Sequence, residues 1–217
     1  MTDSPDVLRR LAALPVANVG DAMDRLNVCQ SVLRTMCPGL TLAGPAYTVR
    51  TRPGDNLYIH KALAGLEPGQ ILVVSGGGDI DRALIGELIA GRAVAKGCAG
   101  IVIDGAVRDV AVLQALGIPV FARAVTPAGP YKDGPGELDV PVAVADVVVR
   151  PGDYVLGDDD GVVVVPRERA ATVVARAEDK QRQEDAKRTE IAAQLGLEAF
   201  PPRRLTRSAA PALGAAP

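Results

Sequence analysis

The chain has 217 residues, of which 48% are hydrophobic and 23% charged, enough for one well-filled core. A formal charge of -2 gives no basic field for a phosphate backbone, and 3% aromatic residues cannot build a base-stacking surface. We therefore expect no binding to nucleic acid. The N-terminal segment MTDSPDVLRRLAALP lacks the features of a secretory signal, and no stretch approaches the roughly 20 apolar residues that span a bilayer. We expect a cytoplasmic protein without a membrane segment.

The metal-binding and redox residue types are few. Cys29, Cys37 and Cys98 are odd in number and form no C-x-x-C pair, so we expect free thiols in a reducing compartment. His60 is the only histidine, which excludes a histidine-rich zinc site. A single histidine on a helix is more often a structural hydrogen-bonding group than a catalyst, and the sequence leaves its role open.

In chain order, the first expected elements are two short helices. Ser4 can cap a helix that has Pro5 in its first turn, with apolar residues at helical spacing after it. After the break at Pro15, a second helix is expected over 17–26. Its polar positions, such as Asp21, are more typical of caps or a solvated face than of a catalytic group.

The next segments predict a strand and a third helix. Alternation over 40–52 favours either a strand pair or one strand bent around Gly44-Pro45. Asp55 then caps a helix that runs to about Leu66. Further on, we expect a helix over 110–116 and a buried strand over 120–122.

The C-terminal half predicts a loop, strands and a long helix. Residues 126–139 are rich in Gly and Pro and predict a long surface loop. From Val140, valine-rich runs separated by tight turns at 150–153 and 158–161 predict an antiparallel meander. The acidic turn DDDG lacks the spaced ligands of a calcium loop.

The last expected element is one long helix over 167–195. Its charged middle either leaves the body of the domain or crosses a neighbouring subunit. Residues 1–199 are expected to form a single domain, and 200–217 a disordered tail that is rich in Pro, Ala and Arg.

The stretch SGGGDIDRALIGELIAGRAVAKGCAGIVIDGAVRD, residues 75–109, carries the chemistry. Apolar strands are expected over 71–75 and 100–104. The three glycines after the first strand suggest a dinucleotide loop, but Asp81 stands where the third glycine of that motif belongs. Asp79 would also repel a pyrophosphate. We therefore reject a dinucleotide-binding fold.

A helix start at Gly86-Glu87 is the first candidate ligand-binding feature. Glycine is tolerated at a helix cap, and an acid in the first turn suits the helix dipole. The free backbone amides of Glu87, Leu88 and Ile89 can then hold a carboxylate. The alternative is that Glu87 only complements the dipole.

Arg108 and Asp109 are the second candidate feature, because they follow a strand end, where α/β proteins place ligands. Such neighbours can also be an ordinary surface pair. The helix and strand between Glu87 and Arg108 return the chain to the helix start, so two carboxylates and a guanidinium converge. Oxygen ligands without thiolates favour Mg²⁺ or Mn²⁺.

An acid followed after twenty residues by Arg-Asp, inside GELIAGRAVAKGCAGIVIDGAVRD, resembles the class II pyruvate aldolases that cleave 4-hydroxy-4-methyl-2-oxoglutarate. These enzymes share a fold with the regulator of ribonuclease E activity. The similarity covers about residues 16–166, including GDNLYIHKAL and GDYVLGDDDGVVVVP. The resemblance implies a three-layer β/β/α swivelling-domain fold of the α/β class. It also implies a homotrimer or a hexamer with sites at subunit interfaces.

Roles follow from the resemblance residue by residue. It implies that Asp109 binds the divalent metal and that Glu87 holds a metal-bound water. Arg108 would contact the 2-keto-acid substrate and stabilise the enolate, and the amides of Gly86, Glu87, Leu88 and Ile89 would bind its carboxylate. Oxaloacetate decarboxylation is the expected second activity. The alternative is a non-catalytic regulator of the ribonuclease E type, for which the family implies loss of the metal-binding acid, here retained as Asp109.

Overall fold

The structure is a computed structural model that describes residues 5–200, so the expected cap Ser4 and residues 201–217 of the expected tail lie outside the described residues. The helices are α1 (Pro5–Ala12), α2 (Val16–Ala22), α3 (Leu57–Gly65), α4 (Glu87–Ala95), α5 (Val110–Leu116) and α6 (Ala170–Gln194), with a 3₁₀ turn at Arg167–Arg169 before α6. The strands are β1 (Arg34–Thr35), β2 (Leu42–Thr51), β3 (Ile71–Ser75), β4 (Ala83–Ile85), β5 (Gly100–Val107), β6 (Val120–Val125), β7 (Gly136–Leu138), β8 (Val142–Val144), β9 (Val147–Val149), β10 (Tyr154–Asp158) and β11 (Gly161–Val165).

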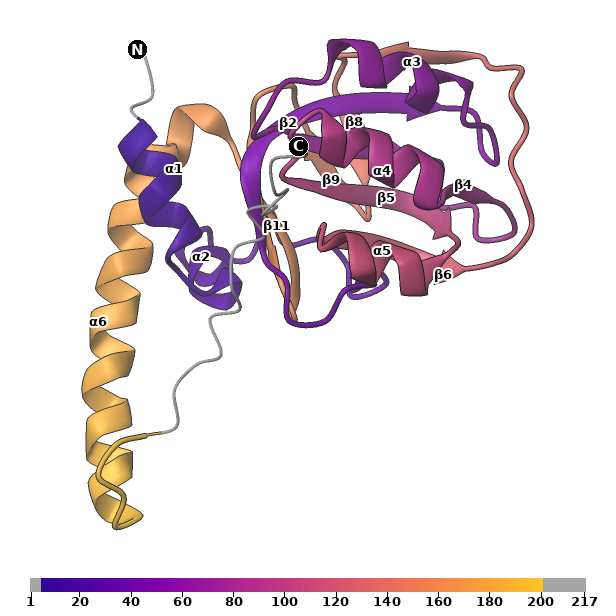
Figure 1. Cartoon of the computed structure of the whole chain (residues 1–217). Coiled ribbons are helices and arrows are strands. Elements are labelled where there is room, and N and C mark those ends of the chain that lie inside the picture. Colours follow the sequence, from indigo (N-terminus) through magenta and orange to yellow (C-terminus); the bar gives the residue numbers. More distant parts are fainter. Residues whose placement is uncertain (1–4, 201–217) are drawn as a thin grey trace, which may run out of the picture.

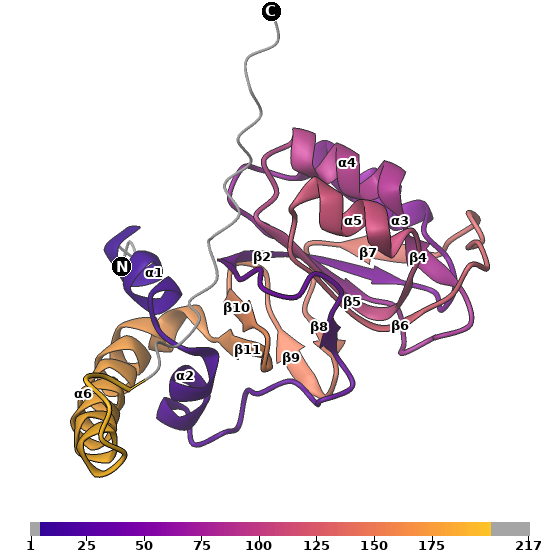
Figure 2. The same cartoon turned by 60° about the horizontal axis from the view of Figure 1, so that its bottom comes forward.

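The main sheet has a parallel centre and antiparallel edges. Its order is β1-β6-β5-β3-β2-β10-β11, with β4 beside β5 and β7 beside β2. The strands β2, β3, β5 and β6 run parallel, and the connections between them contain α3, α4 and α5. These three helices cover one face of the parallel strands (Figures 1 and 2). The hairpin β8–β9 lies on the other side, and β10 and β11, at the end of the sheet, pack toward that side as well. The expected three-layer β/β/α arrangement is confirmed.

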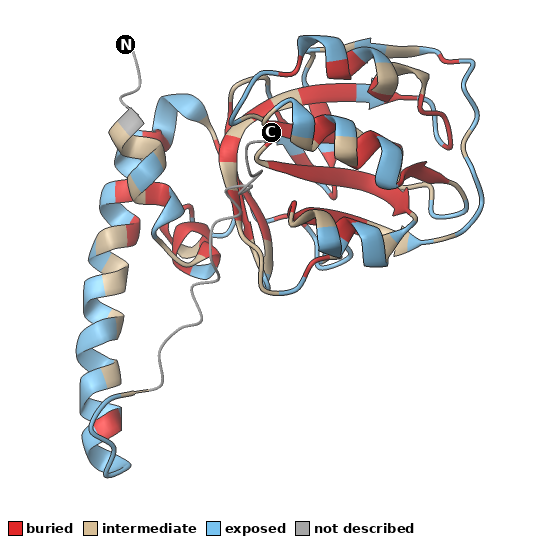
Figure 3. Cartoon of the chain, viewed as in Figure 1, coloured by how far each residue is buried: buried red, intermediate tan, exposed pale blue. Residues whose placement is uncertain are grey.

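Separate apolar cores hold these layers together. One fills the space between the sheet and the helices, and includes Ile59, Ala90, Ile103 and Leu113. A second lies between the sheet and the hairpins. The parallel strands are buried on both faces (Figure 3), as expected for continuous apolar runs such as Ile71–Ser75.

The sequence left the form of the strand over 42–51 open and placed the end of the second helix too late. β2 is one bent strand, because its first half pairs with β10 and its second half with β3. The second helix ends at Ala22, so the prediction that it extends to Leu26 is wrong. Asp24 and Arg25 have φ of 57° and 65°, which a continuing right-handed helix does not allow.

The predicted meander is also wrong in part. Residues 142–149 are not one strand but a hairpin, β8–β9, which turns at Ala145 and Asp146 with positive φ. β10 pairs with β2 and β11 and not with β9. The predicted loop 126–139 contains a short strand, β7, that pairs with β2 at the far end of the loop.

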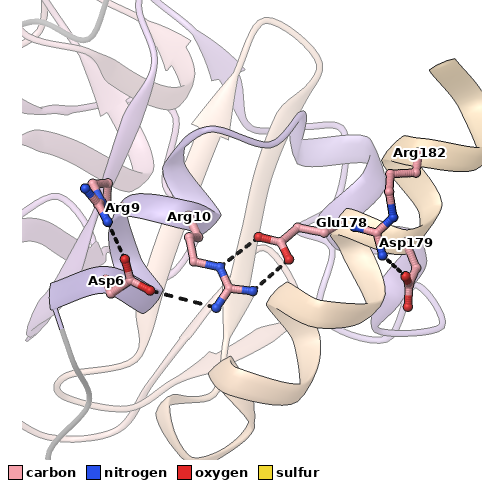
Figure 4. Close-up of polar contacts among 6 residues, drawn as sticks. All are labelled: Asp6, Arg9, Arg10, Glu178, Asp179 and Arg182. Carbon is pink, nitrogen blue, oxygen red and sulfur yellow. Dashed lines mark hydrogen bonds and ion pairs between the residues drawn. The ribbon is translucent and has the colours of Figure 1, made fainter.

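The long C-terminal helix is confirmed, and its first half packs on α1 and α2 in a third apolar core. Arg10 of α1 makes a two-pronged ion pair with Glu178 of α6, with nitrogen–oxygen distances of 2.8 and 2.7 Å (Figure 4). Beyond this contact, α6 extends away from the sheet (Figure 1). None of the helices within residues 5–200 combines the length and the apolar character needed to cross a membrane.

Candidate active site

The two candidate features lie side by side because of β4, a strand that the sequence analysis missed. β4 pairs in parallel with the end of β5, with Ile85 opposite Val107. The Arg108 amide donates to the Ile85 carbonyl at 3.0 Å. Gly86, the N-cap of α4, therefore lies next to Arg108 and Asp109. The segments that the sequence expected to converge are in contact.

The Asp109 side chain points to α4 and not to its own helix. Asp109 is at the N-cap position of α5 with φ 58° and ψ 36°, and its side chain makes no capping hydrogen bond there. Its Oδ2 accepts a hydrogen bond from the Glu87 amide at 3.1 Å. The Arg108 Nε lies 3.4 Å from the same oxygen. A negative charge thus complements the positive end of α4.

This contact changes which amides are available to a ligand. The sequence predicts free amides at Glu87, Leu88 and Ile89, but that of Glu87 is bonded to Asp109. The first four amides of a helix have no partner within the helix. Those of Leu88 and Ile89 therefore remain the candidates for binding an anion.

A cavity of about 190 Å³ opens beside this helix start. Gly86, Leu88, Ile89 and Arg108, which the sequence analysis named, line it, whereas the other two named residues, Glu87 and Asp109, do not. Three more polar residues line the cavity, namely Asn56, His60 and Lys132. Asn56 and Lys132 carry little signal in the sequence, because their positions at a helix start and in a Gly/Pro-rich loop explain them equally well.

The charges around the cavity favour an anionic ligand. Arg108 and Lys132 both line it, and no carboxylate among the described residues does. Burial, and then the charges of Lys132 and Arg92, lower the pKa of His60 below its ordinary value. His60 is therefore neutral at pH 7 and can either donate or accept a hydrogen bond.

Asp55 holds the loop 126–139 against the cavity. Its fully buried carboxylate accepts hydrogen bonds from the amides of Leu57, Asp133 and Gly134, at 2.9, 2.7 and 2.9 Å. Burial alone would raise the pKa of Asp55, but these three bonds and the charge of Arg52 outweigh it and hold the pKa below its ordinary value. The wall of the cavity that carries Lys132 is consequently fixed.

The acids near Arg108 fit a hard divalent cation that takes few of its ligands from the protein. Within residues 5–200, no three His, Cys, Asp or Glu side chains are grouped closely enough to enclose a metal ion. Asp109 provides one carboxylate beside Arg108, and Glu87 is the acid in the first turn of the adjoining helix α4. Mg²⁺ commonly binds one or two carboxylates and keeps several waters, so this donor set suits it better than a metal that needs a complete protein cage.

Comparison with known proteins assigns the family. The model of the RraA-like family, described as Aldolase/RraA, matches residues 16–164. A 4-hydroxy-4-methyl-2-oxoglutarate aldolase from Thermus thermophilus is 43% identical over 57% of this chain and 75% of its own length. A protein from Halalkalibacterium halodurans is 36% identical over 86% of this chain and 89% of its own length. It is provisionally named as the same enzyme.

A solved structure extends the comparison to the fold. RraAS2 from Streptomyces coelicolor, described as an unusual member of the RNase ES inhibitor RraA protein family, superimposes with a TM-score of 0.79 and 30% identity. The match covers 87% of this chain and 98% of that chain. The chain therefore belongs to the RraA-like family, Aldolase/RraA, as its central motif indicated.

Proposed function

We propose that this protein is a divalent-metal-dependent lyase. It cleaves 4-hydroxy-4-methyl-2-oxoglutarate, or a related 4-hydroxy-2-keto-diacid, and releases pyruvate. The observation that carries the proposal is the contact of Arg108 with Asp109 at the N-terminus of α4, beside a cavity lined by a second cation, Lys132. The aldolase names of the relatives support the same chemistry.

The reaction needs stabilisation of the charge that develops when the carbon–carbon bond breaks. The amides of Leu88 and Ile89 bind the carboxylate of the pyruvyl part, as helix N-termini bind anions. Arg108 donates to the keto-acid oxygens, on which enolate charge develops. Glu87 would accept, through a water molecule, the proton that leaves the C4 hydroxyl. Mg²⁺ or Mn²⁺ held by Asp109, with Glu87 nearby, would supply Lewis-acid stabilisation of the same charge.

Oxaloacetate decarboxylation follows from the same site. Loss of CO₂ from oxaloacetate leaves the same pyruvate enolate and requires no base. The groups that stabilise the enolate, foremost Arg108, therefore serve both reactions. We propose this decarboxylation as a second activity.

The test measures pyruvate release by the purified full-length chain. Each substrate is supplied with Mg²⁺ or Mn²⁺, and pyruvate is followed with lactate dehydrogenase and NADH. We expect turnover of both substrates, loss of activity in EDTA and recovery on adding excess metal. Absence of pyruvate from either substrate, with EDTA making no difference, would refute the lyase.

A second candidate function is inhibition of a ribonuclease. It is favoured by the structural similarity to RraAS2, which is described as belonging to an inhibitor family. On this alternative, the purified protein slows RNA cleavage by a ribonuclease of the E type, and the Asp109→Asn variant does so equally well. An active lyase that leaves the ribonuclease rate unchanged would exclude it.

We also propose that the chain assembles as a homotrimer or hexamer. The support is at the far end of α6, a helix that leaves the body of the domain (Figure 1). Ile191 near the end of this helix is exposed, as are Leu195 and Leu197 just beyond it. Apolar side chains grouped in this way are typical of an interface. Light scattering coupled to gel filtration gives the mass, and a monomer at micromolar concentration would contradict the proposal.

A further inference from the structure

Asn56 has a buried polar atom without a partner. The side chain is 4% exposed, and its Nδ2 donates to the Leu84 carbonyl at 3.0 Å. Its Oδ1 is the one buried side-chain nitrogen or oxygen among the described residues that has no hydrogen bond. The orientation of the amide is fixed, because the Leu84 carbonyl can only accept. An unpaired buried oxygen of this kind costs about 1–3 kcal/mol, so its place in the fold needs an explanation.

The explanation lies in what surrounds it. Asn56 lines the same cavity as Arg108 and Lys132. The backbone around Asn56 is also fixed. Its backbone amide donates to the Tyr131 carbonyl at 3.0 Å, and the neighbouring Asp55 holds the loop that contains Tyr131. An unpaired acceptor that is held rigidly beside a cavity is a candidate for binding a ligand there.

We propose that Asn56 determines substrate specificity by accepting a hydrogen bond from the substrate hydroxyl. This inference rests on the proposed lyase function. Arg108 and Lys132 can only donate, so they suit the anionic ends of a keto-diacid. The Asn56 Oδ1 can only accept, so it suits an O–H group and disfavours a carboxylate. At C4, the aldol substrate carries a hydroxyl, whereas oxaloacetate carries the oxygens of its leaving carboxylate. Asn56 thus favours the aldol substrate over oxaloacetate.

The experiment compares two reactions in one protein. For Asn56→Ala with Mg²⁺ present, we expect kcat/KM for 4-hydroxy-4-methyl-2-oxoglutarate to fall about 10- to 100-fold, and that for oxaloacetate to stay within about threefold. The inhibition constant of 2-oxoglutarate, a keto-diacid that lacks the hydroxyl, should also stay within about threefold. This constant reports on binding independently of turnover. If Asn56→Ala is poorly folded, Asn56→Leu, which retains the volume, is measured in the same way.

Two control variants make the assignment specific. Asn18 is also buried, at 3% exposed, but its Nδ2 donates to the Oε1 of Gln181 on α6, away from the cavity lining. Asn18→Ala should leave the ratio of the two reactions unchanged. In the other control, His60→Gln alters the cavity's other uncharged polar side chain besides Asn56.

The outcomes separate the two proposals. Equal loss of both reactions in Asn56→Ala would assign Asn56 a structural role and overturn the inference. A selective loss of the aldol reaction in His60→Gln, without one in Asn56→Ala, would overturn it in favour of His60. Both results leave the lyase intact, whereas wild-type protein that releases no pyruvate from either substrate refutes the lyase and this inference together.

Discussion

The carboxylate of Asp109 lies over the first turn of α4, with its Oδ2 3.1 Å from the Glu87 amide nitrogen. One side chain thereby connects the starts of two helices, α4 and α5. Gly86 makes this approach possible, because a Cβ on it would stand 2.2 Å from the same oxygen. The backbone of Gly86 is extended, so the requirement for glycine is one of space.

Gly86→Ala should disable the site while preserving the fold. The added methyl group would meet the Asp109 carboxylate and lie 2.9 Å from the Arg108 Cγ, so both side chains must move. A displacement of about 1 Å commonly costs about 100-fold in rate, and we expect at least that loss in pyruvate release from either substrate. Gly91→Ala is the control on the same helix, since its methyl group meets nothing within 4 Å. It should retain activity and gain about 0.5–1 kcal/mol from helix propensity.

Asp109→Asn should separate structure from charge. Asparagine tolerates the left-handed backbone of this position and still offers an oxygen to the Glu87 amide, so the melting temperature should change little. The charge available to a divalent cation is lost. We therefore expect weaker Mn²⁺ binding by calorimetry and at least a 100-fold loss in both reactions. A variant with wild-type Mn²⁺ affinity would show that Asp109 is no metal ligand.

The three cysteines should be unreactive in the folded protein. All are free, as the sequence predicted, and all are buried. Burial, with a smaller contribution from the charge of Asp104, raises the pKa of Cys29 to about 12. Burial likewise raises the pKa of Cys37 and Cys98. The aromatic disulfide reagent DTNB at pH 8 should modify no thiol on the timescale of minutes, and three after denaturation. Rapid reaction of one thiol in native protein would contradict this.

The sequence predicted those parts of the fold that follow from local pattern. Apolar runs such as Ile71–Ser75 and the helix start at Gly86-Glu87 were predicted correctly, because burial on both faces and capping are properties of a short segment. The hairpin β8–β9 was missed, because its turn consists of Ala145 and Asp146, which carry no glycine or proline signal. A turn that long-range packing imposes leaves little trace in the sequence.

The candidate site likewise has one part that the sequence predicted and one part that it did not. The approach of Arg108 to the start of α4 was predicted from the helix and the strand between them, although β4, the short strand that carries the pairing, was missed. The other wall of the cavity comes from the loop 126–139 and the start of α3. Lys132 reaches it only because the loop is bonded to Asp55, more than 70 residues earlier in the chain. Such a contact has no local signature.

Asp55→Asn should therefore loosen one wall of the cavity and destabilise the fold. The amides of Asp133 and Gly134 both donate to one carboxylate oxygen, and that of Leu57 to the other. An asparagine NH₂ group would face a donor in either orientation. We expect a loss of about 2–3 kcal/mol in the free energy of unfolding by urea at pH 7. Amide exchange over residues 131–134 should become faster.

The pH dependence tests the same interaction. Because the pKa of Asp55 is lowered in the folded protein, its contribution to stability is fully present above the unfolded pKa of about 3.9 and is lost as the pH falls through the folded value. The stability difference between wild type and Asp55→Asn should be constant from pH 7 to pH 5 and shrink below about pH 4. Asp133→Asn removes an exposed charge 3.8 Å from Arg52 and should cost less than about 1 kcal/mol. A difference that persists undiminished well below pH 3 would show that the charge of Asp55 does not hold the loop.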